Sequence, residues 1–148
     1  SQLLYENGAP KNGIYRQWNS SSRKKSEGTY EGGKKHGVEI NWYEFGPIGE
    51  EKGGILSRCT WADNKIHGTY TEWFKNGRKR WEITLENGIK HGPEKTWDGL
   101  GNLVAEGENR NDKPWNGTVL VTDGDVSRYG RFVDGVEQQI IIEQTELR

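Results

Sequence analysis

Residues 68–92 read GTYTEWFKNGRKRWEITLENGIKHG, and this stretch decides the fold. Residues 78–85 are rich in Trp, Ile, Thr and Leu with partial alternation, which is typical of a β-strand. The Asn-Gly pair within residues 86–92 favours a tight hairpin connection, because Asn and Gly reach positive φ at little cost. Residues 69–74 predict another short strand, and the Lys-Asn-Gly of residues 75–77 predicts a turn. The stretch therefore predicts short antiparallel strands joined by glycine turns.

The same pattern recurs along the chain with a period of about 24 residues. Each copy contains a His-Gly pair, and the other positions are counted from its glycine. A bulky residue lies seven residues before this glycine, a Trp lies five residues after it, and another glycine lies nine residues after it. The three clear copies have the pairs His36 and Gly37, His67 and Gly68, and His91 and Gly92, followed by Trp42, Trp73 and Trp97. Weaker copies start at Gly13, which is followed by Trp18, and at Gly117, which is followed by Thr122.

The five glycines of this column, Gly13, Gly37, Gly68, Gly92 and Gly117, are separated by 24, 31, 24 and 25 residues. The long interval predicts an insertion near residues 46–54, a stretch that contains Pro47. Residues 136–147 include three consecutive isoleucines and predict a capping strand. We therefore expect one all-β domain over residues 1–148, an elongated array of about five antiparallel β-hairpin repeats with about ten to twelve strands.

The composition fits this architecture and excludes several classes of protein. Hydrophobic residues make up only 30% of the 148 residues, while the chain has 21 Gly and seven Trp. The net charge of −1 argues against disorder driven by charge and against general nucleic-acid binding. No apolar run in the sequence is long enough to span a membrane, and we expect no signal peptide within these residues. We expect a soluble protein, either cytoplasmic or exported after loss of a leader.

The positions of the aromatic residues in the repeat indicate which of them are expected in the core and which could contact a partner. Trp18, Trp42, Trp73 and Trp97 share one repeat column, so we expect their rings to stack between hairpins and form the core. Tyr43 and Phe74 each follow a column tryptophan and should point to the opposite face of the sheet. Trp115 occupies a turn position that stacking does not explain. We interpret it either as an exposed contact or as a cap over the final unit. These three residues are the candidate partner-binding residues.

No residue pattern indicates catalysis, a metal site or a cofactor. The three histidines occupy one repeat column, so stacking would place them roughly 9–10 Å apart, too far to share one ion. Cys59 is the only cysteine, which excludes an internal disulfide, and no nucleophile motif surrounds it. We expect a structural strand cysteine, no cofactor and no enzymatic activity.

The unit that runs from Trp73 through Gly77, Leu85, Gly88 and Gly92 to Trp97 resembles the MORN repeat, most closely its bacterial variant. The stretches at residues 30–37 and 61–68 match the same turn. The resemblance implies a rod or curved sheet of consecutive hairpins. It also implies a role as an interaction module, because such proteins bind protein partners, sometimes associate with phospholipid, and in bacteria are often labelled antitoxin-like. The chain departs from the pattern near Pro47 and at Thr122.

The function expected from these observations is a non-catalytic protein–protein interaction module. One alternative is binding of a carbohydrate or cell-surface glycan through exposed aromatic rings. Another is association with an anionic phospholipid surface, since residues 1–36 carry seven Lys or Arg against three Glu.

Overall fold

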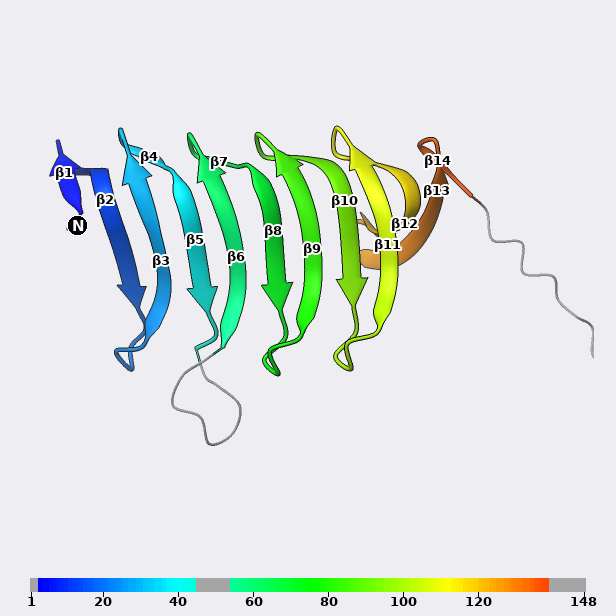
Figure 1. Cartoon of the computed structure of the whole chain (residues 1–148), viewed down its shortest axis with the longest axis horizontal. Helices are drawn as coiled ribbons and strands as arrows, with labels where there is room; N and C mark the ends of the chain where they lie inside the picture. The colour runs from blue at the N-terminus through cyan, green and yellow to red at the C-terminus, as the bar shows by residue number, and fades with distance from the viewer. Residues whose placement is uncertain (1–2, 45–53, 139–148) are drawn as a thin grey trace, which may run out of the picture.

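The computed structural model describes residues 3–44 and 54–138, and these residues form a single antiparallel sheet (Figure 1). The strands are β1 Leu4–Glu6, β2 Ala9–Trp18, β3 Lys24–Glu31, β4 Lys34–Lys35, β5 Gly37–Trp42, β6 Ile55–Ala62, β7 Lys65–Ile66, β8 Gly68–Trp73, β9 Lys79–Glu86, β10 Ile89–Trp97, β11 Leu103–Arg110, β12 Lys113–Asp123, β13 Val126–Val133 and β14 Val136–Glu137. The described part of the chain has no helix, and so none that is long and apolar enough to cross a membrane.

The strands follow one another across the sheet in chain order, which confirms the predicted all-β array of hairpins. The strand count exceeds the expected ten to twelve because the chain forms brief ladders around its turns, such as β4 against β3 and β7 against β6. The predicted insertion near residues 46–54 falls almost entirely outside the described residues. The predicted capping strand over residues 136–147 begins at β14, and its remainder from residue 139 onward also lies outside them.

The turns along one edge of the sheet are two-residue turns with positive φ at both positions, as Asn87 (52°) and Gly88 (83°) illustrate. This geometry matches the twist of the flanking strands and explains the Asn, Asp and Gly residues found there. The column glycines serve a different purpose. Gly92 has a φ of 113° and lies four residues after the turn, where the register between β9 and β10 shifts. The column glycine therefore creates a bulge after the turn, where a left-handed backbone is needed.

The best-buried side chains lie on one face of the sheet, which we call the inner face. The residues two positions after the column glycines, Tyr15, Glu39, Tyr70, Glu94 and Val119, belong to this face. The buried hydrophobic residues Cys59, Ile83, Ala105, Val119 and Phe132 belong to it as well, and Ile83 and Val119 are only 1% exposed. Register explains the clustering, because Glu39 lies opposite Cys59 and Tyr70 lies opposite Ile83.

The tryptophan column does not form the expected core, and its Trp42 ring lies on the opposite face of the sheet, which we call the outer face. Trp42 follows Asn41, whose side chain donates to Ser57 on the inner face, so the Trp42 ring points outward. Trp18 is 57% exposed, and the other three column rings are half-buried. Lysines pack over two of these rings, with Lys24 Nζ 4.9 Å from the centre of the Trp42 ring and Lys79 Nζ 5.6 Å from that of Trp97. The column is thus partly exposed, with lysines over two of its four rings, and it is not the core.

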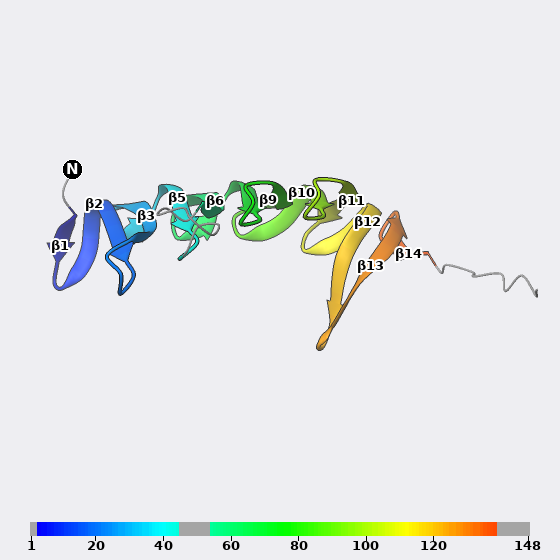
Figure 2. The same ribbon diagram turned by 90° about the horizontal axis from the view of Figure 1, so that it is seen from below.

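The hairpin of β12 and β13 leaves the plane of the sheet (Figure 2). Gly107 and Gly117 face each other at the base of this hairpin. A Cβ added at Gly117 would lie 2.5 Å from the carbonyl oxygen of Glu106, and one at Gly107 would lie 2.6 Å from a methyl of Val119. The absence of both side chains permits the close approach of β11 and β12 from which the hairpin departs.

Candidate binding surface

Two hollows lie at opposite ends of the sheet. The first, which we call the C-terminal cleft, has a volume of about 330 Å³ and lies between the sheet and the bent hairpin. It is lined by Glu72, Phe74, Arg80, Trp81, Thr96, Trp97, Leu120 and Tyr129. The second, which we call the N-terminal groove, has a volume of about 630 Å³. Its polar lining includes Tyr15, Gln17, Ser26, Lys35, Glu39 and Asn41.

The C-terminal cleft combines aromatic walls with one unpaired cation. Arg80 stacks over the Phe74 ring at 5.8 Å from its centre, and its side chain forms no ion pair with any residue that the structure describes. The Trp81 ring contacts Tyr70 edge to face, with the ring centres 5.6 Å apart. Across the cleft, Tyr129 remains 43% exposed. The cleft therefore offers apolar ring surface beside a guanidinium group that can bind an anion.

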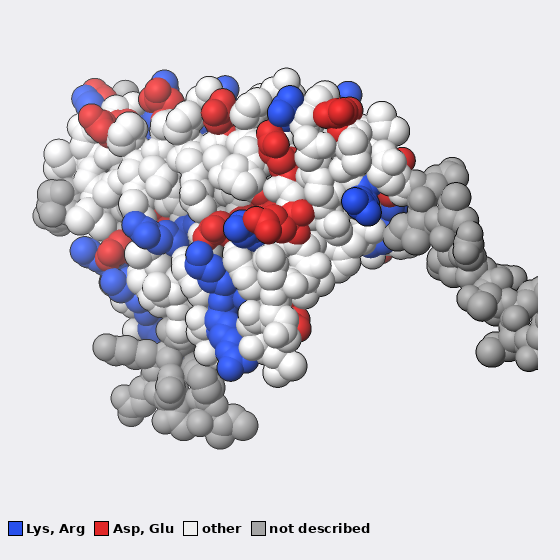
Figure 3. All heavy atoms as spheres, turned by 45° about the vertical axis from the view of Figure 1, so that its right-hand side comes forward, with Lys and Arg blue, Asp and Glu red and all other residues white. Residues whose placement is uncertain are grey.

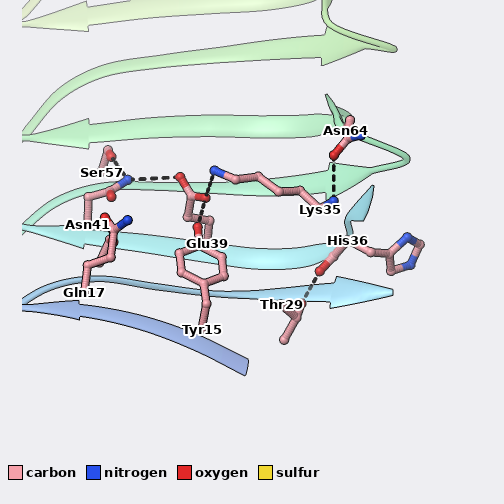
Figure 4. A network of polar contacts seen from close by, with 10 residues as sticks. Tyr15, Gln17, Thr29, Lys35, His36, Glu39, Asn41, Ser57 and Asn64 are labelled. Carbon is pink, nitrogen blue, oxygen red and sulfur yellow. Dashed lines mark hydrogen bonds and ion pairs between the residues drawn. The ribbon is translucent and has the colours of Figure 1, made fainter. Parts of the chain in front are cut away.

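Glu39 lies at the floor of the N-terminal groove in a network of polar contacts (Figure 4). Lys35 Nζ lies 2.6 Å from its carboxylate, and the Tyr15 hydroxyl and Asn41 amide also donate to it. Burial by itself raises the pKa of Glu39, but the hydrogen bonds from Lys35 and Tyr15 outweigh burial, and the pKa lies below its ordinary value. Burial and the neighbouring Glu39 carboxylate raise the pKa of Tyr15. The carboxylate is therefore ionised and firmly held.

Glu94 occupies the equivalent position two repeats later and is also held by donors. It is 3% exposed and accepts hydrogen bonds from Trp81 Nε1 at 2.9 Å and from Asn109 Nδ2 at 2.5 Å. Both buried glutamates thus have partners that fix their geometry. This is the arrangement expected of carboxylates that organise a sheet face, rather than of a free general acid or base.

The structure brings two of the three predicted contact residues together and separates the third. Tyr43 donates its hydroxyl to the carbonyl of Trp73 at 2.7 Å, next to Phe74, and both predicted rings follow strand ends at the same edge of the sheet. Trp115 lies near the start of β12, at the opposite edge (Figure 1). Its ring packs against Gly135 and beneath the Arg110 guanidinium, which lies 4.5 Å from the ring centre.

Each of the three rings is half-buried, and each carries a cation on one face. Lys75 covers Tyr43 at 5.6 Å, Arg80 covers Phe74, and Arg110 covers Trp115. Of the three, Phe74 lines the C-terminal cleft. For Trp115, the contact with the last turn supports the interpretation as a cap over the final unit.

Cys59 and the histidines are not grouped into a catalytic or metal site among the described residues. Cys59 is free and buried, and burial together with the Glu39 charge raises the pKa of its thiol to about 11. His36 and His67 are exposed and follow the turns, where their backbone amides donate to β3 and β6. Among residues 3–44 and 54–138, no group of three or more His, Cys, Asp or Glu side chains is placed to hold a metal ion.

Sequence reasoning missed the polar ladder of the inner face, which includes Tyr15, Glu39, Tyr70 and Glu94. The signal was present, because Tyr and Glu alternate two residues after successive column glycines. It was obscured because tryptophans dominate the pattern and because a carboxylate in an antiparallel strand ordinarily faces solvent.

Comparison of the sequence with protein-family models and with curated proteins finds no match to either.

Proposed function

We propose that this chain is a non-catalytic interaction module that binds another protein through the C-terminal cleft. The single observation that carries the proposal is the bent hairpin, which places Leu120 and Tyr129 opposite Phe74 and Trp81. Protein interfaces draw most of their binding free energy from a few pocketed aromatic and arginine residues, and the cleft presents such a set. The resemblance to MORN repeats agrees with a role in binding.

The chemistry of the cleft indicates which partner segment it would accept. The rings of Phe74 and Trp81 suit an aliphatic or aromatic side chain, and Arg80, which has no ion pair among the described residues, suits a neighbouring carboxylate. We therefore infer an apolar anchor residue flanked by Asp or Glu in the partner.

Charge elsewhere on the surface supports a local contact rather than a broad electrostatic one. Acidic and basic side chains intermingle along the edge of the sheet that carries the two-residue turns (Figure 3). Several cations of the basic N-terminal region form ion pairs, including Arg16 with Glu27 and Lys34 with Asp63. Such pairing leaves less positive charge for an anionic lipid surface.

The proposal is tested by affinity capture from an extract of the source cells with matched variants. Phe74→Ala and Arg80→Ala remove the two central features of the cleft. Val38→Ala removes an exposed apolar side chain from the outer face, and serves as the control. A partner retained by wild type and Val38→Ala but lost with both cleft variants supports the proposal. A partner retained equally by all four proteins contradicts it.

A further inference from the structure

The N-terminal groove differs from the C-terminal cleft in its chemistry, because its floor is polar. Ser26 and Glu39, at 5% and 8% exposure, are buried there, and Gln17 and Asn41 flank them. The floor comes from neighbouring strands, since Gln17 of β2 lies opposite Ser26 of β3, which lies opposite Asn41 of β5. Figure 4 shows Gln17, Asn41 and Glu39 on the same side of these strands. The groove is therefore a continuous polar surface spanning three strands.

The charges of the groove cancel one another. Lys35 pairs with Glu39 at 2.6 Å, and Arg16 pairs with Glu27 at 2.5 Å. Lys35 is further restrained because its ammonium group also lies 4.7 Å from the centre of the Trp61 ring. An ionic ligand would have to break one of these pairs, so the groove favours a neutral ligand.

The uncharged polar groups keep unused hydrogen-bonding capacity. Gln17 Oε1 accepts from the Ser26 hydroxyl, which leaves the Gln17 amide nitrogen without a partner among the described residues. Asn41 Nδ2 donates to Ser57 and Glu39, which leaves the side-chain oxygen of Asn41, Oδ1, without a hydrogen-bond partner among the described residues. A primary amide has two donors and one acceptor oxygen with two lone pairs, so each side chain can bind a ligand without giving up its contact in the protein.

Aromatic side chains frame this floor. Tyr5 and Trp18 are 63% and 57% exposed and line the rim of the groove. Tyr15 and Tyr30 form one wall and pack edge to face with ring centres 5.4 Å apart. Exposed rings beside a floor of amides and hydroxyls provide apolar faces next to directional donors and acceptors.

We propose that the N-terminal groove is a binding site for a neutral saccharide. A sugar carries hydroxyl groups that both donate and accept, together with C–H faces that stack on aromatic rings, and it carries no charge to disturb the ion pairs of the groove. An extended peptide is a poorer fit, because strand addition relies on main-chain groups of the edge. Here the free groups belong to the side chains of Gln17 and Asn41. The site is separate from the C-terminal cleft and goes beyond the protein-binding function proposed above.

The experiment is calorimetric titration of the purified protein with three neutral hexasaccharides: cellohexaose, chitohexaose and maltohexaose. We expect at least one to bind with a Kd of about 1 mM or tighter. Asn41→Ala and Gln17→Ala should each weaken that binding about fivefold or more, since a buried hydrogen bond to the ligand is lost. Gln138→Ala removes an exposed amide far along the chain, near β14, and should leave the affinity unchanged.

The outcomes separate this site from the proposed protein-binding cleft. Phe74→Ala should bind the saccharide as wild type does, while losing the captured protein partner. A thermal unfolding curve for each variant establishes that the sheet remains folded. Absence of binding by all three hexasaccharides up to about 5 mM overturns the proposal. It is also overturned if Asn41→Ala and Gln17→Ala both bind like wild type, or if a synthetic peptide with the sequence of β3 binds while no saccharide does.

Discussion

The polar network around Glu39 makes a quantitative prediction about the stability of the sheet. Replacing Glu39 with Ala leaves Lys35 and Tyr15 without their acceptor on the inner face. Removing one partner of a fully buried ion pair costs roughly 3–5 kcal/mol. The Lys35 side chain is 29% exposed and can recover part of its hydration, so we expect a loss of about 2–3 kcal/mol in the free energy of unfolding. In a chain of this length that loss lowers the Tm by about 4–12 °C.

Urea denaturation at pH 7 with a matched variant measures this effect. Glu31→Ala removes an exposed carboxylate, with 74% side-chain exposure, that lies 3.7 Å from His36. It should change the free energy of unfolding by less than about 0.5 kcal/mol. A loss in Glu39→Ala no larger than that in Glu31→Ala would refute the reasoning, because the network would then contribute nothing beyond a surface ion pair.

The pH dependence of a third variant, Glu39→Gln, fixes the sign of the contribution that the Glu39 charge makes to stability. The folded-state pKa of Glu39 lies below the ordinary value of 4.5, so its stabilisation is present in full above about pH 4.5. It is lost as the pH falls through the folded-state pKa. The difference in free energy of unfolding between wild type and Glu39→Gln should therefore be largest near neutral pH and shrink on acidification. A difference that grows below pH 4.5 would show that the pKa is raised instead.

Two further predictions test the packing of the inner face. Gly107→Ala should lower the free energy of unfolding by about 2 kcal/mol or more, because the new Cβ would lie 2.7 Å from a backbone carbonyl oxygen. The control Gly99→Ala, whose Cβ meets open space, should lower it by less than about 0.5 kcal/mol. Chemical denaturation compares the two variants, and equal effects would mean that β11 and β12 do not approach so closely. Cys59, with its buried thiol of pKa about 11, should react with a thiol reagent at pH 7.5 only after denaturant is added, and rapid labelling of the native protein would contradict its burial.

Local chemistry made the hairpins predictable. The alternation of residues 78–85 and the Asn-Gly pair after them match β9 and its turn to within one residue. Both signals act over a few neighbouring residues, so no distant contact is needed to interpret them. The repeat then extends the same conclusion to the other hairpins.

The choice of core face was not predictable in the same way. Each bulge adds one residue to a strand and shifts the alternation of faces beyond it, as Leu56 does in β6, where Asn41 pairs with Ser57 but Trp42 pairs with Ile55. The large Trp42 ring suggested a core position, whereas its burial depends on Lys24 in the preceding hairpin. The fold over the C-terminal cleft depends on the approach of Gly107 to Gly117, a contact between strands that no local pattern specifies.

The candidate site residues also differ in whether neighbouring residues or distant strands determine their contacts. Phe74 could be predicted, because it follows a column tryptophan and alternation places it on the other face. The role of Glu39 could not, because one of its partners, Tyr15, lies 24 residues away and only the packed sheet brings the two together. Trp115 stood out in the sequence as unexplained, and its contacts with Arg110 and Gly135 are likewise tertiary.

The most direct test of the proposed protein-binding function is site-specific photocrosslinking in an extract of the source cells. A benzophenone amino acid is placed at position 74 or 129, on the two walls of the C-terminal cleft, and at position 38 on the outer face as the control. We predict one common crosslinked protein from positions 74 and 129 and none of it from position 38. Crosslinking of that protein from position 38 alone, or from all three positions equally, would contradict binding through the cleft.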